Sequence, residues 1–336
     1  MTQAAPNAPL VLICGLDHAN IMEEQDVLAR AGVRFEVVPA RTEAEYLERC
    51  GDADGLLVQY GAVTRRVLEG LSRLRVVVRY GVGVDGIDLA AATDQGVPVV
   101  NVPDYGTDEV ANHAVALLLA LARKLARLDR QTRSGDWDVF RVGPVARLAG
   151  QTVGILGCGR IGSAVARKLG GFDVRLLGCD PYVDIFPPGV RPVAFERLLA
   201  ESDHLTIHCP LTPDTRHLFD AETLAWLRPT AVLINTARGG IVDTAALVEA
   251  LQLGLLAGAG LDVLEAEPID PASPLLRMEQ VIVTPHAAWY SEEGRSDLKR
   301  RAAEEAVRVL RGERPRHCVN PEVWGRLRRS PVAKGP

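Results

Sequence analysis

Residues 152–180 of this 336-residue chain read TVGILGCGRIGSAVARKLGGFDVRLLGCD. An apolar run leads into Gly-x-Gly-x-x-Gly over 157–162. A stretch with apolar residues at helical spacing follows, and then a second apolar run that ends in Asp180. A strand, a tight glycine turn, a helix and a second strand in this order indicate a unit with parallel strands. The stretch therefore predicts an α/β fold built on a parallel sheet.

The glycine loop 157–162 has the features of a phosphate-binding turn. Gly157 permits the tight turn, Gly159 lets the backbone approach a phosphate, and Gly162 lets the helix pack on the strand. Backbone N–H groups at a helix N-terminus attract anions. Arg160, inside the loop, adds positive charge. A plain strand-to-helix turn is the alternative, but the surrounding order of elements favours a dinucleotide site.

Asp180 specifies which dinucleotide is expected. It ends the second apolar run, about 20 residues beyond the loop, where a carboxylate accepts hydrogen bonds from the adenosine ribose. The same carboxylate repels a 2′-phosphate, and Pro181 and Tyr182 follow it rather than Arg or Lys. The sequence therefore predicts NAD (NADH) as cofactor, with NADP less favoured.

A second Gly-x-Gly-x-x-Gly, GVGVDG, occupies residues 81–86. Asp85 lies inside this pattern and Asp88 just after it, and both carboxylates would repel a pyrophosphate. We therefore expect a tight turn with exposed backbone amides at this position, not a nucleotide site.

Apolar, β-branched runs alternate with helical patterns along most of the chain, which predicts parallel sheets covered on both faces. The alternation forms two series, and so two α/β units. The predicted strands are 10–15, 34–39, 55–60, 74–80 and 97–103 in the first series, and 152–157, 174–180, 204–210, 231–237, 258–265 and 281–287 in the second. The predicted helices include 23–32, 64–71, 107–130, 162–172, 244–256 and 292–313, and the tail beyond Pro315 is expected to pack loosely.

Composition excludes several classes of protein. The net charge of −5 argues against nucleic-acid binding, and the apolar stretch before Arg123 is too short to span a membrane. Six scattered cysteines without a Cys-x-x-Cys pair argue against a metal site and favour a reducing compartment, hence the cytoplasm. The N-terminus lacks the basic start of a signal peptide.

Three segments of the second series end predicted strands, where an open parallel sheet binds its ligands. They are NTARGG with Arg238, LDVLEAEP with Asp262 and Glu267, and VTPHAAW with His286 and Trp289. Taken singly, each has an ordinary explanation as a surface arginine, a loop acid or a structural histidine. Together, beside a dinucleotide loop, they suggest a catalytic group.

Hydride transfer to a carbonyl needs three such parts. A histidine donates the proton near neutral pH, and His286 is the candidate. A neighbouring carboxylate, Glu267, would stabilise the imidazolium and fix its orientation. An arginine fork, Arg238, would hold a substrate carboxylate and polarise the carbonyl.

Taken together, GCGRIG, INTARGGIVD, LDVLEAEP and TPHAAW resemble the D-isomer-specific 2-hydroxyacid dehydrogenase family over nearly the whole chain. TPHAAWYSE most resembles the C-terminal-binding-protein branch, whereas RYGVGVDGID and VPDYGTDEVA resemble phosphoglycerate-dehydrogenase-like members. A departure is Asn112, where many members carry Glu.

The resemblance implies roles for individual residues. His286 would be the acid/base, Glu267 its partner and Arg238 the substrate anchor, with the hydride moving from nicotinamide C4. Asp262 would bind the nicotinamide carboxamide. The cofactor would be lined by Leu156, Gly157, Gly159, Arg160, Ile161, Gly162, Asp180, Cys209, Pro210, Thr215, Thr236, Ala237 and Asp262. The substrate would meet Arg79, Gly81, Val82, Gly83 and Trp289, although Trp289 has an equal explanation as a core residue.

The resemblance also implies two Rossmann-like domains, one flavodoxin-like and one dinucleotide-binding, with a cleft between them. Residues 1–102 and 289–336 would form the substrate domain, and 103–288 the NAD-binding Rossmann domain, with hinges near Pro103 and Ala287. Asp85 and Asp88 would favour the N-terminus of the helix that follows them. The helix from Thr107 resembles a dimerisation arm, which predicts a homodimer, although its apolar face is equally explained as intramolecular core.

These features predict an NAD-dependent oxidoreductase that interconverts a small 2-oxo acid and a D-2-hydroxy acid. Two alternatives stay open at this point. One is an NAD(H)-sensing, corepressor-like interaction protein. The other is a dehydrogenase of a phosphorus-containing acid on the same fold, because Arg79 and Arg238 would suit any small anion. A formate-type enzyme is disfavoured because such enzymes carry Gln where Glu267 stands.

Overall fold

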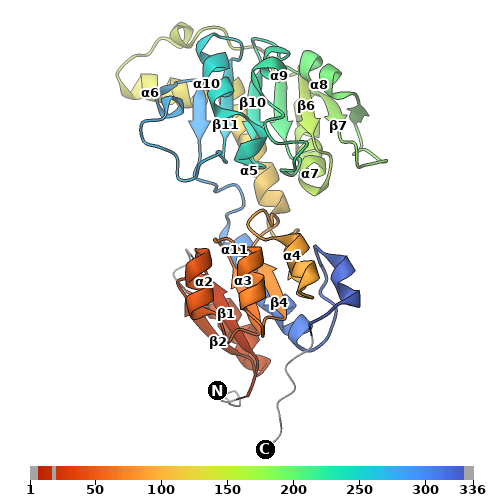
Figure 1. The fold of residues 1–336 in the computed structure, drawn as a ribbon. Helices are drawn as coiled ribbons and strands as arrows, with labels where there is room; N and C mark the ends of the chain where they lie inside the picture. Colours follow the sequence, from red (N-terminus) through yellow and green to blue (C-terminus); the bar gives the residue numbers. More distant parts are fainter. Residues whose placement is uncertain (1–6, 17–19, 329–336) are drawn as a thin grey trace, which may run out of the picture. The chain divides into compact units, whose positions relative to one another are not determined.

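The computed structural model describes residues 7–16 and 20–328. The N-terminal segment, which is predicted not to be a signal peptide, lies partly outside these ranges. Two compact units are present (Figure 1): unit 1 comprises Met1–Gly106 with Ser291–Pro336, and unit 2 comprises Thr107–Tyr290. The predicted domain boundaries, after residue 102 and after residue 288, lie within a few residues of the two ends of unit 2. Which unit binds substrate and which binds NAD stays a prediction.

Unit 1 contains a five-stranded sheet in the order β2-β1-β3-β4-β5. All neighbouring strands pair in parallel, as the alternation of strands and helices predicts. The strands are β1 (Leu10–Cys14), β2 (Arg34–Val38), β3 (Gly55–Val58), β4 (Val76–Arg79) and β5 (Val99–Val100). The helices are α1 (Met22–Arg30), α2 (Glu43–Arg49), α3 (Arg65–Gly70), α4 (Leu89–Asp94) and α11 (Glu292–Leu310), with the 3-10 turn η5 (Pro321–Gly325).

Alternate residues of the unit 1 strands face opposite helical layers. Leu12, Leu56 and Val77 form one core with α2, α3 and α4, and Figure 1 shows α2 and α3 lying over this face of the sheet. On the other face, α11 packs against β3, β4 and α1. Both faces of the sheet are therefore covered, as a buried parallel sheet requires.

A buried ion pair joins α11 to α1. The side chain of Lys299 is 1% exposed, and its Nζ lies 2.5 Å from Glu23 Oε2 and 3.5 Å from Glu24 Oε2. Tyr80 Oη donates to Glu24 Oε1 at 2.9 Å. Burial raises the pKa of Glu24, and the charge on Lys299 and the hydrogen bond from Tyr80 only partly offset it.

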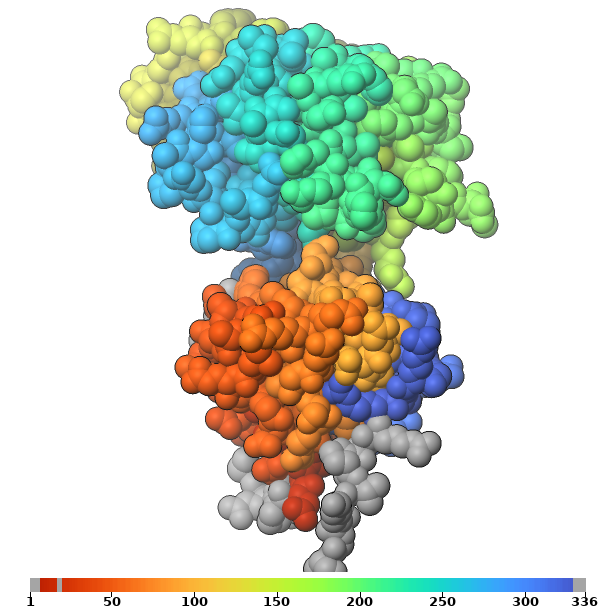
Figure 2. Space-filling view, viewed as in Figure 1, coloured from red at the N-terminus to blue at the C-terminus, as the bar shows by residue number. Residues whose placement is uncertain are grey.

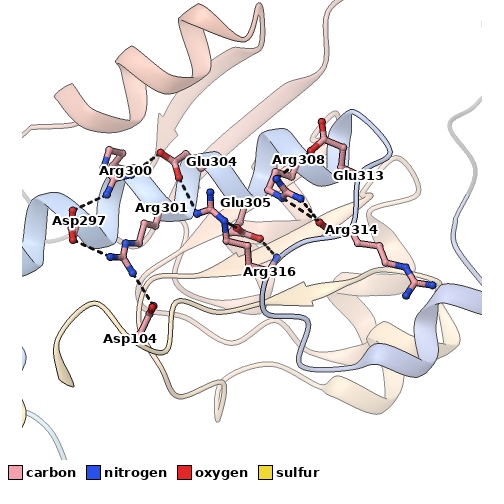
Figure 3. Close-up of polar contacts among 10 residues, drawn as sticks. All are labelled: Asp104, Asp297, Arg300, Arg301, Glu304, Glu305, Arg308, Glu313, Arg314 and Arg316. Atoms are coloured by element: carbon pink, nitrogen blue, oxygen red, sulfur yellow. Dashed lines mark hydrogen bonds and ion pairs between the residues drawn. The ribbon is translucent and has the colours of Figure 1, made fainter. Parts of the chain in front are cut away.

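The outer face of α11 carries a chain of ion pairs (Figure 3). Asp297 pairs with Arg300 and Arg301, and Arg301 reaches Asp104 at 2.9 Å. Further along, Glu304 accepts from Arg300 and from Arg316, whose main-chain N–H also donates to Glu305. Most of these side chains are partly exposed to solvent, so each pair contributes little stability alone.

The segment after Pro315 contradicts the expected loose packing over its described part. Asn320 is 1% exposed. Its Oδ1 accepts from Val99 N at 2.8 Å, and its Nδ2 donates to Thr93 Oγ1 at 3.0 Å and Val97 O at 3.1 Å. Arg328 donates to the carbonyls of Leu68 and Leu71 at the end of α3. No periodicity marks this segment in the sequence, because single side chains rather than a regular element fasten it.

Unit 2 contains a seven-stranded parallel sheet in the order β12-β11-β10-β9-β6-β7-β8. The strands are β6 (Thr152–Leu156), β7 (Arg175–Cys179), β8 (Val190–Pro192), β9 (His204–Ile207), β10 (Val232–Asn235), β11 (Gly258–Leu261) and β12 (Val281–Val283). The helices are α5 (Thr107–Ala122), α6 (Leu125–Arg133), α7 (Arg160–Leu169), α8 (Phe195–Glu201), α9 (Ala221–Ala225) and α10 (Thr244–Gln252). The 3-10 turns are η1 (Val139–Val142), η2 (Gly170–Phe172), η3 (Gly239–Ile241) and η4 (Pro274–Arg277).

Two cores cover the faces of this sheet. One packs α5 and α7 on residues such as Val153 and Ile155, and the other packs α8, α9 and α10 on residues such as Leu205 and Leu233. The strand order reverses between β6 and β9, and ligands of open α/β sheets bind outside the carboxyl ends of the strands at such a point. The predicted fold class, with two parallel sheets, is confirmed.

The predicted helix 107–130 is wrong in its length. The structure has two helices, α5 and α6, separated at Lys124, whose φ of +53° is left-handed. Lys124 Nζ donates to Val142 O at 2.6 Å. Leucines continue at helical spacing across the break, so the periodicity carried no sign of it.

Candidate active site

The glycine loop leads from β6 into α7 at the point where the strand order reverses. A Cβ on Gly157, whose φ is +86°, would lie 2.6 Å from Cys209 N on the loop after β9. A Cβ on Gly162 would lie 2.0 Å from Gly157 O. By contrast, a Cβ on Gly159 would meet no described atom within 4 Å, and Gly159, the N-cap of α7, has no side chain to cap the helix. Open space before uncapped helix amides fits a phosphate group.

Asp180 follows β7 and lies beside this loop. Its Oδ2 accepts from Cys158 N at 2.8 Å and its Oδ1 from Tyr182 N at 2.9 Å. The two bonds fix the carboxylate at the edge of the glycine loop. This placement fits a ribose hydroxyl as a further donor to the same carboxylate.

The other glycine pattern, residues 81–86, joins β4 to α4 in unit 1. Asp88 is the N-cap of α4 and accepts from Ala91 N at 2.8 Å. The prediction that this carboxylate favours the following helix is confirmed. Asn101 Nδ2 donates to Val82 O at 2.6 Å, and Val102 N donates to Gly81 O at 3.0 Å, so two bonds fasten the loop. Roles of Arg79, Gly81, Val82 and Gly83 toward a substrate stay predictions.

In unit 2, the turn after β10 carries Arg238. The side chain of Asn235, 1% exposed, accepts from Ala237 N at 3.0 Å and donates to Arg238 O at 2.9 Å. This side chain therefore clamps the backbone around Arg238. Sequence reasoning missed it, although an Asn at the end of a strand favours such local bonds.

Gly239 and Glu265 make the contacts that bring three loops together at the carboxyl edge of the unit 2 sheet. A Cβ on Gly239 would lie 1.9 Å from the carbonyl carbon of Leu264, so the turn that follows Arg238 lies flush against the loop that carries Glu267. Glu265 accepts from His217 Nε2 at 2.5 Å and from Thr244 N at 2.7 Å. No motif in the sequence marks His217 or Glu265 as a pair, because their contact joins loops 48 positions apart.

The predicted catalytic pair forms in the structure. His286 Nδ1 lies 2.8 Å from Glu267 Oε2, and Glu267 Oε1 accepts from Leu264 N at 2.9 Å. Because Glu267 engages Nδ1, the Nε2 atom of His286 is the one left to exchange a proton with a ligand.

Electrostatics hold Glu267 in its ionised form. Burial alone would raise the pKa of its carboxyl group. The hydrogen bonds from His286 and Leu264 N, with the charges on His286 and Arg238, outweigh burial and lower the pKa below its usual value. The Arg238 charge is the smallest of these contributions to the lowered pKa of Glu267.

Asp262 follows β11 and holds the loop of His286. The backbone of His286 is left-handed, with φ +53°, and its N–H donates to Asp262 O at 2.8 Å. The Asp262 carboxylate accepts from Ala287 N and Ala288 N, both at 2.9 Å. The implied contact with a nicotinamide carboxamide stays a prediction.

The remaining predicted cofactor residues lie at the carboxyl edge of the same sheet. Thr215 Oγ1 donates to Pro210 O at 2.7 Å, which closes the loop after Cys209. Thr236 follows β10, and its buried Oγ1 has no hydrogen-bond partner among the described residues. A buried hydroxyl in that state fits a site that takes a polar ligand. Trp289 packs edge-on against Tyr290 with ring centres 5.8 Å apart, and its predicted substrate contact stays untested.

Residues 7–16 and 20–328 contain neither a metal-binding cluster nor a membrane span. In that part of the chain, no three His, Cys, Asp or Glu side chains converge as a metal-binding group. No helix there combines the length and apolar character needed to cross a bilayer. All six cysteines are free thiols.

Unit 2 is thus a Rossmann-type parallel sheet with a His–Glu pair and an arginine in the loops at its carboxyl edge. A model of the D-isomer specific 2-hydroxyacid dehydrogenase NAD binding domain matches residues 115–288. A glyoxylate reductase from Korarchaeum cryptofilum is 44% identical over 285 residues, covering 82% of this chain and 86% of that protein. A D-3-phosphoglycerate dehydrogenase from Methanocaldococcus jannaschii is 40% identical over 290 residues, covering 85% of this chain and 55% of that protein.

A solved structure agrees with these relatives. The TT0316 protein from Thermus thermophilus matches with a TM-score of 0.82 at 35% identity, covering 92% of this chain and 99% of that chain. The chain belongs to the D-isomer specific 2-hydroxyacid dehydrogenase family. The predicted family is confirmed. The matching model describes the NAD binding domain of this family, which supports NAD(H) as the cofactor.

Proposed function

We propose that the protein is an NAD-dependent oxidoreductase that interconverts a small 2-oxo acid and its D-2-hydroxy acid. The observation that carries this proposal is the His286–Glu267 bond of 2.8 Å, in a loop against which the turn after Arg238 packs at Gly239. When bound, the nicotinamide would supply or accept the hydride at its C4 atom. NAD is preferred to NADP because the Asp180 carboxylate, held by two backbone amides, leaves a 2′-phosphate facing a negative charge.

The chain's own residues supply the proton and the orientation. In reduction, His286 Nε2 gives a proton to the carbonyl oxygen while Glu267 retains the Nδ1–H bond and stabilises the positive ring. Arg238 binds the substrate carboxylate through its guanidinium fork and stabilises charge on the carbonyl oxygen. Oxidation uses the same groups in reverse, with Nε2 accepting the proton.

We take glyoxylate as the first substrate to test, because the relative from Korarchaeum cryptofilum is a glyoxylate reductase. A panel of larger 2-oxo acids and phosphorus-containing acids tests the side-chain range, including Trp289. Binding of NADH without turnover of any acid would instead favour the NAD(H)-sensing alternative.

The decisive variant is Arg238→Ala, with Arg238→Lys keeping the charge but not the fork. We expect kcat/KM for NADH oxidation with glyoxylate to fall by about a hundredfold or more in R238A. Arg277→Ala, an exposed arginine of η4, is the matched control and should leave turnover unchanged. Turnover by R238A near that of the unmodified protein would remove Arg238 from the mechanism.

We also propose that the protein is a homodimer. The scattered free thiols favour a location in the cytoplasm. In support, α6 has no buried residue, and Trp137 and Phe140 beyond it are 89% and 86% exposed. Figure 2 shows this segment, in yellow, standing out at the edge of its unit. Large exposed apolar side chains mark interaction surfaces. Analytical ultracentrifugation of the protein against W137E/F140E tests the dimer.

A further inference from the structure

A hydrogen-bonded chain runs from α5 to the loop of His286, and nothing in the proposed mechanism uses its first member. His113 Nε2 lies 2.9 Å from Thr284 Oγ1, and Thr284 Oγ1 donates to Asp262 Oδ1 at 2.5 Å. His113 Nε2 is also 3.6 Å from Asp262 Oδ1. The three side chains come from α5, from the segment after β12 and from the end of β11.

The donors and acceptors of this chain can be assigned. A carboxylate only accepts, and a hydroxyl has one hydrogen to give. Because the Thr284 hydroxyl gives its hydrogen to Asp262, it must accept from His113. The Nε2 atom of His113 therefore carries a hydrogen, which fixes the direction of the whole chain.

Asp262 is the point where this chain meets the catalytic loop. Its side chain is 1% exposed, whereas that of His113 is 26% exposed. Its carboxylate also receives Ala287 N and Ala288 N, the two amides after His286. A shift of this carboxylate would therefore move the backbone that holds His286 in its left-handed conformation.

We propose that His113 is a positioning residue: through the Thr284 hydroxyl it orients the Asp262 carboxylate and so fixes the loop that carries His286. The effect of His113 on turnover rests on the proposed function, whereas its effect on the conformation of the loop does not. Without the His113 N–H, the Thr284 hydroxyl loses the donor that fixes its rotation, so its bond to Asp262 is held less firmly. Linked polar groups of low exposure gain strength from one another in this way.

The first test needs neither cofactor nor substrate. Hydrogen–deuterium exchange of the peptide spanning 284–290 is compared between the cofactor-free protein and His113→Leu. We expect exchange at the Ala287 and Ala288 amides to become about three- to tenfold faster, which corresponds to the loss of one hydrogen bond. His113→Gln, whose amide N–H can replace Nε2–H, should restore the slow exchange. Asn112→Ala is the control, because the Asn112 side chain is exposed and donates to Asp108 on its own helix.

The second test is a double-mutant cycle on turnover and on NADH affinity, measured by fluorescence. We expect H113L and Thr284→Val each to lower kcat about three- to tenfold, and the double variant to lose no more than the larger single effect. H113Q should keep kcat within about twofold of the unmodified protein.

The outcomes separate the two proposals. Fast exchange in H113L with rescue by H113Q supports the positioning role even where no 2-oxo acid turns over, which would sink only the proposed function. Unchanged exchange in H113L, failure of H113Q to rescue, or independent multiplying effects of H113L and T284V would overturn the positioning role.

Discussion

Two glycines of the loop 157–162 should respond to alanine in opposite ways, and the contrast tests where the dinucleotide binds. At Gly162, a Cβ would lie 2.0 Å from Gly157 O, against a shortest real contact of about 3.0 Å. The start of α7 and the end of β6 must therefore separate by about 1 Å. Overpacking of this kind costs about 3 kcal/mol. For a unit of this size, that lowers Tm by about 6 to 12 °C.

At Gly159, the same methyl group meets no described atom within 4 Å, and the backbone φ of −69° suits alanine. Gly159→Ala should therefore leave the stability of the cofactor-free protein within about 1 kcal/mol of the original. If the pyrophosphate lies against the N-terminus of α7, the methyl group occupies its space. We expect NADH affinity to fall tenfold or more, equivalent to about 1.4 kcal/mol.

The assay pairs thermal unfolding without ligand, followed by circular dichroism, with NADH titration by fluorescence. Gly162→Ala should lower both Tm and affinity, whereas Gly159→Ala should lower affinity alone. A Gly159→Ala protein that binds NADH as tightly as the original would refute the placement of the phosphate at this helix. An unchanged Tm in Gly162→Ala would refute the steric argument.

Two further predictions concern stability. Asn320→Ala leaves the buried N–H of Val99 and the carbonyl of Val97 without their partner. We therefore expect urea denaturation to show a free energy of unfolding lower by about 2 to 4 kcal/mol. The exposed Asn112→Ala should lower it by less than about 0.5 kcal/mol, and equal effects of the two variants would contradict the reasoning. Burial raises the pKa of Glu265, but bonds from Thr244 and His217 outweigh it and hold the pKa below its ordinary 4.5. The carboxylate thus contributes stability above that pH, which is lost as pH falls through the lowered value. Tm measured from pH 6 to pH 3 should therefore drop further in the original protein than in E265Q, and parallel curves would rule this out.

Local patterns sufficed for much of the fold and the site. The glycine loop, the parallel sheets and the pairing of Glu267 with His286 follow from runs of apolar residues and from which residues end each strand. Parallel strands place their carboxyl ends at one edge, so residues far apart in sequence could be brought together without knowing any contact.

Other features depend on contacts that no local pattern carries. β8 is three residues long and ends in Pro192, so it gave no alternating signal. The break at Lys124 is a single left-handed residue within continuing leucine periodicity. His113 and Thr284 are 171 positions apart, and their bond requires α5 and β12 to be neighbours. Asn320 joins the end of the chain to β5 in the same long-range way.

The contact between Gly239 and the Leu264 backbone constrains how this protein can be re-engineered. With no room for a side chain at 239, the loops 235–240 and 261–268 fit as a matched pair. Transplanting either loop alone from a relative would alter the spacing between the Arg238 guanidinium and the Glu267 carboxylate. A library aimed at new acids should therefore exchange the two loops together, or leave both intact and vary their surroundings.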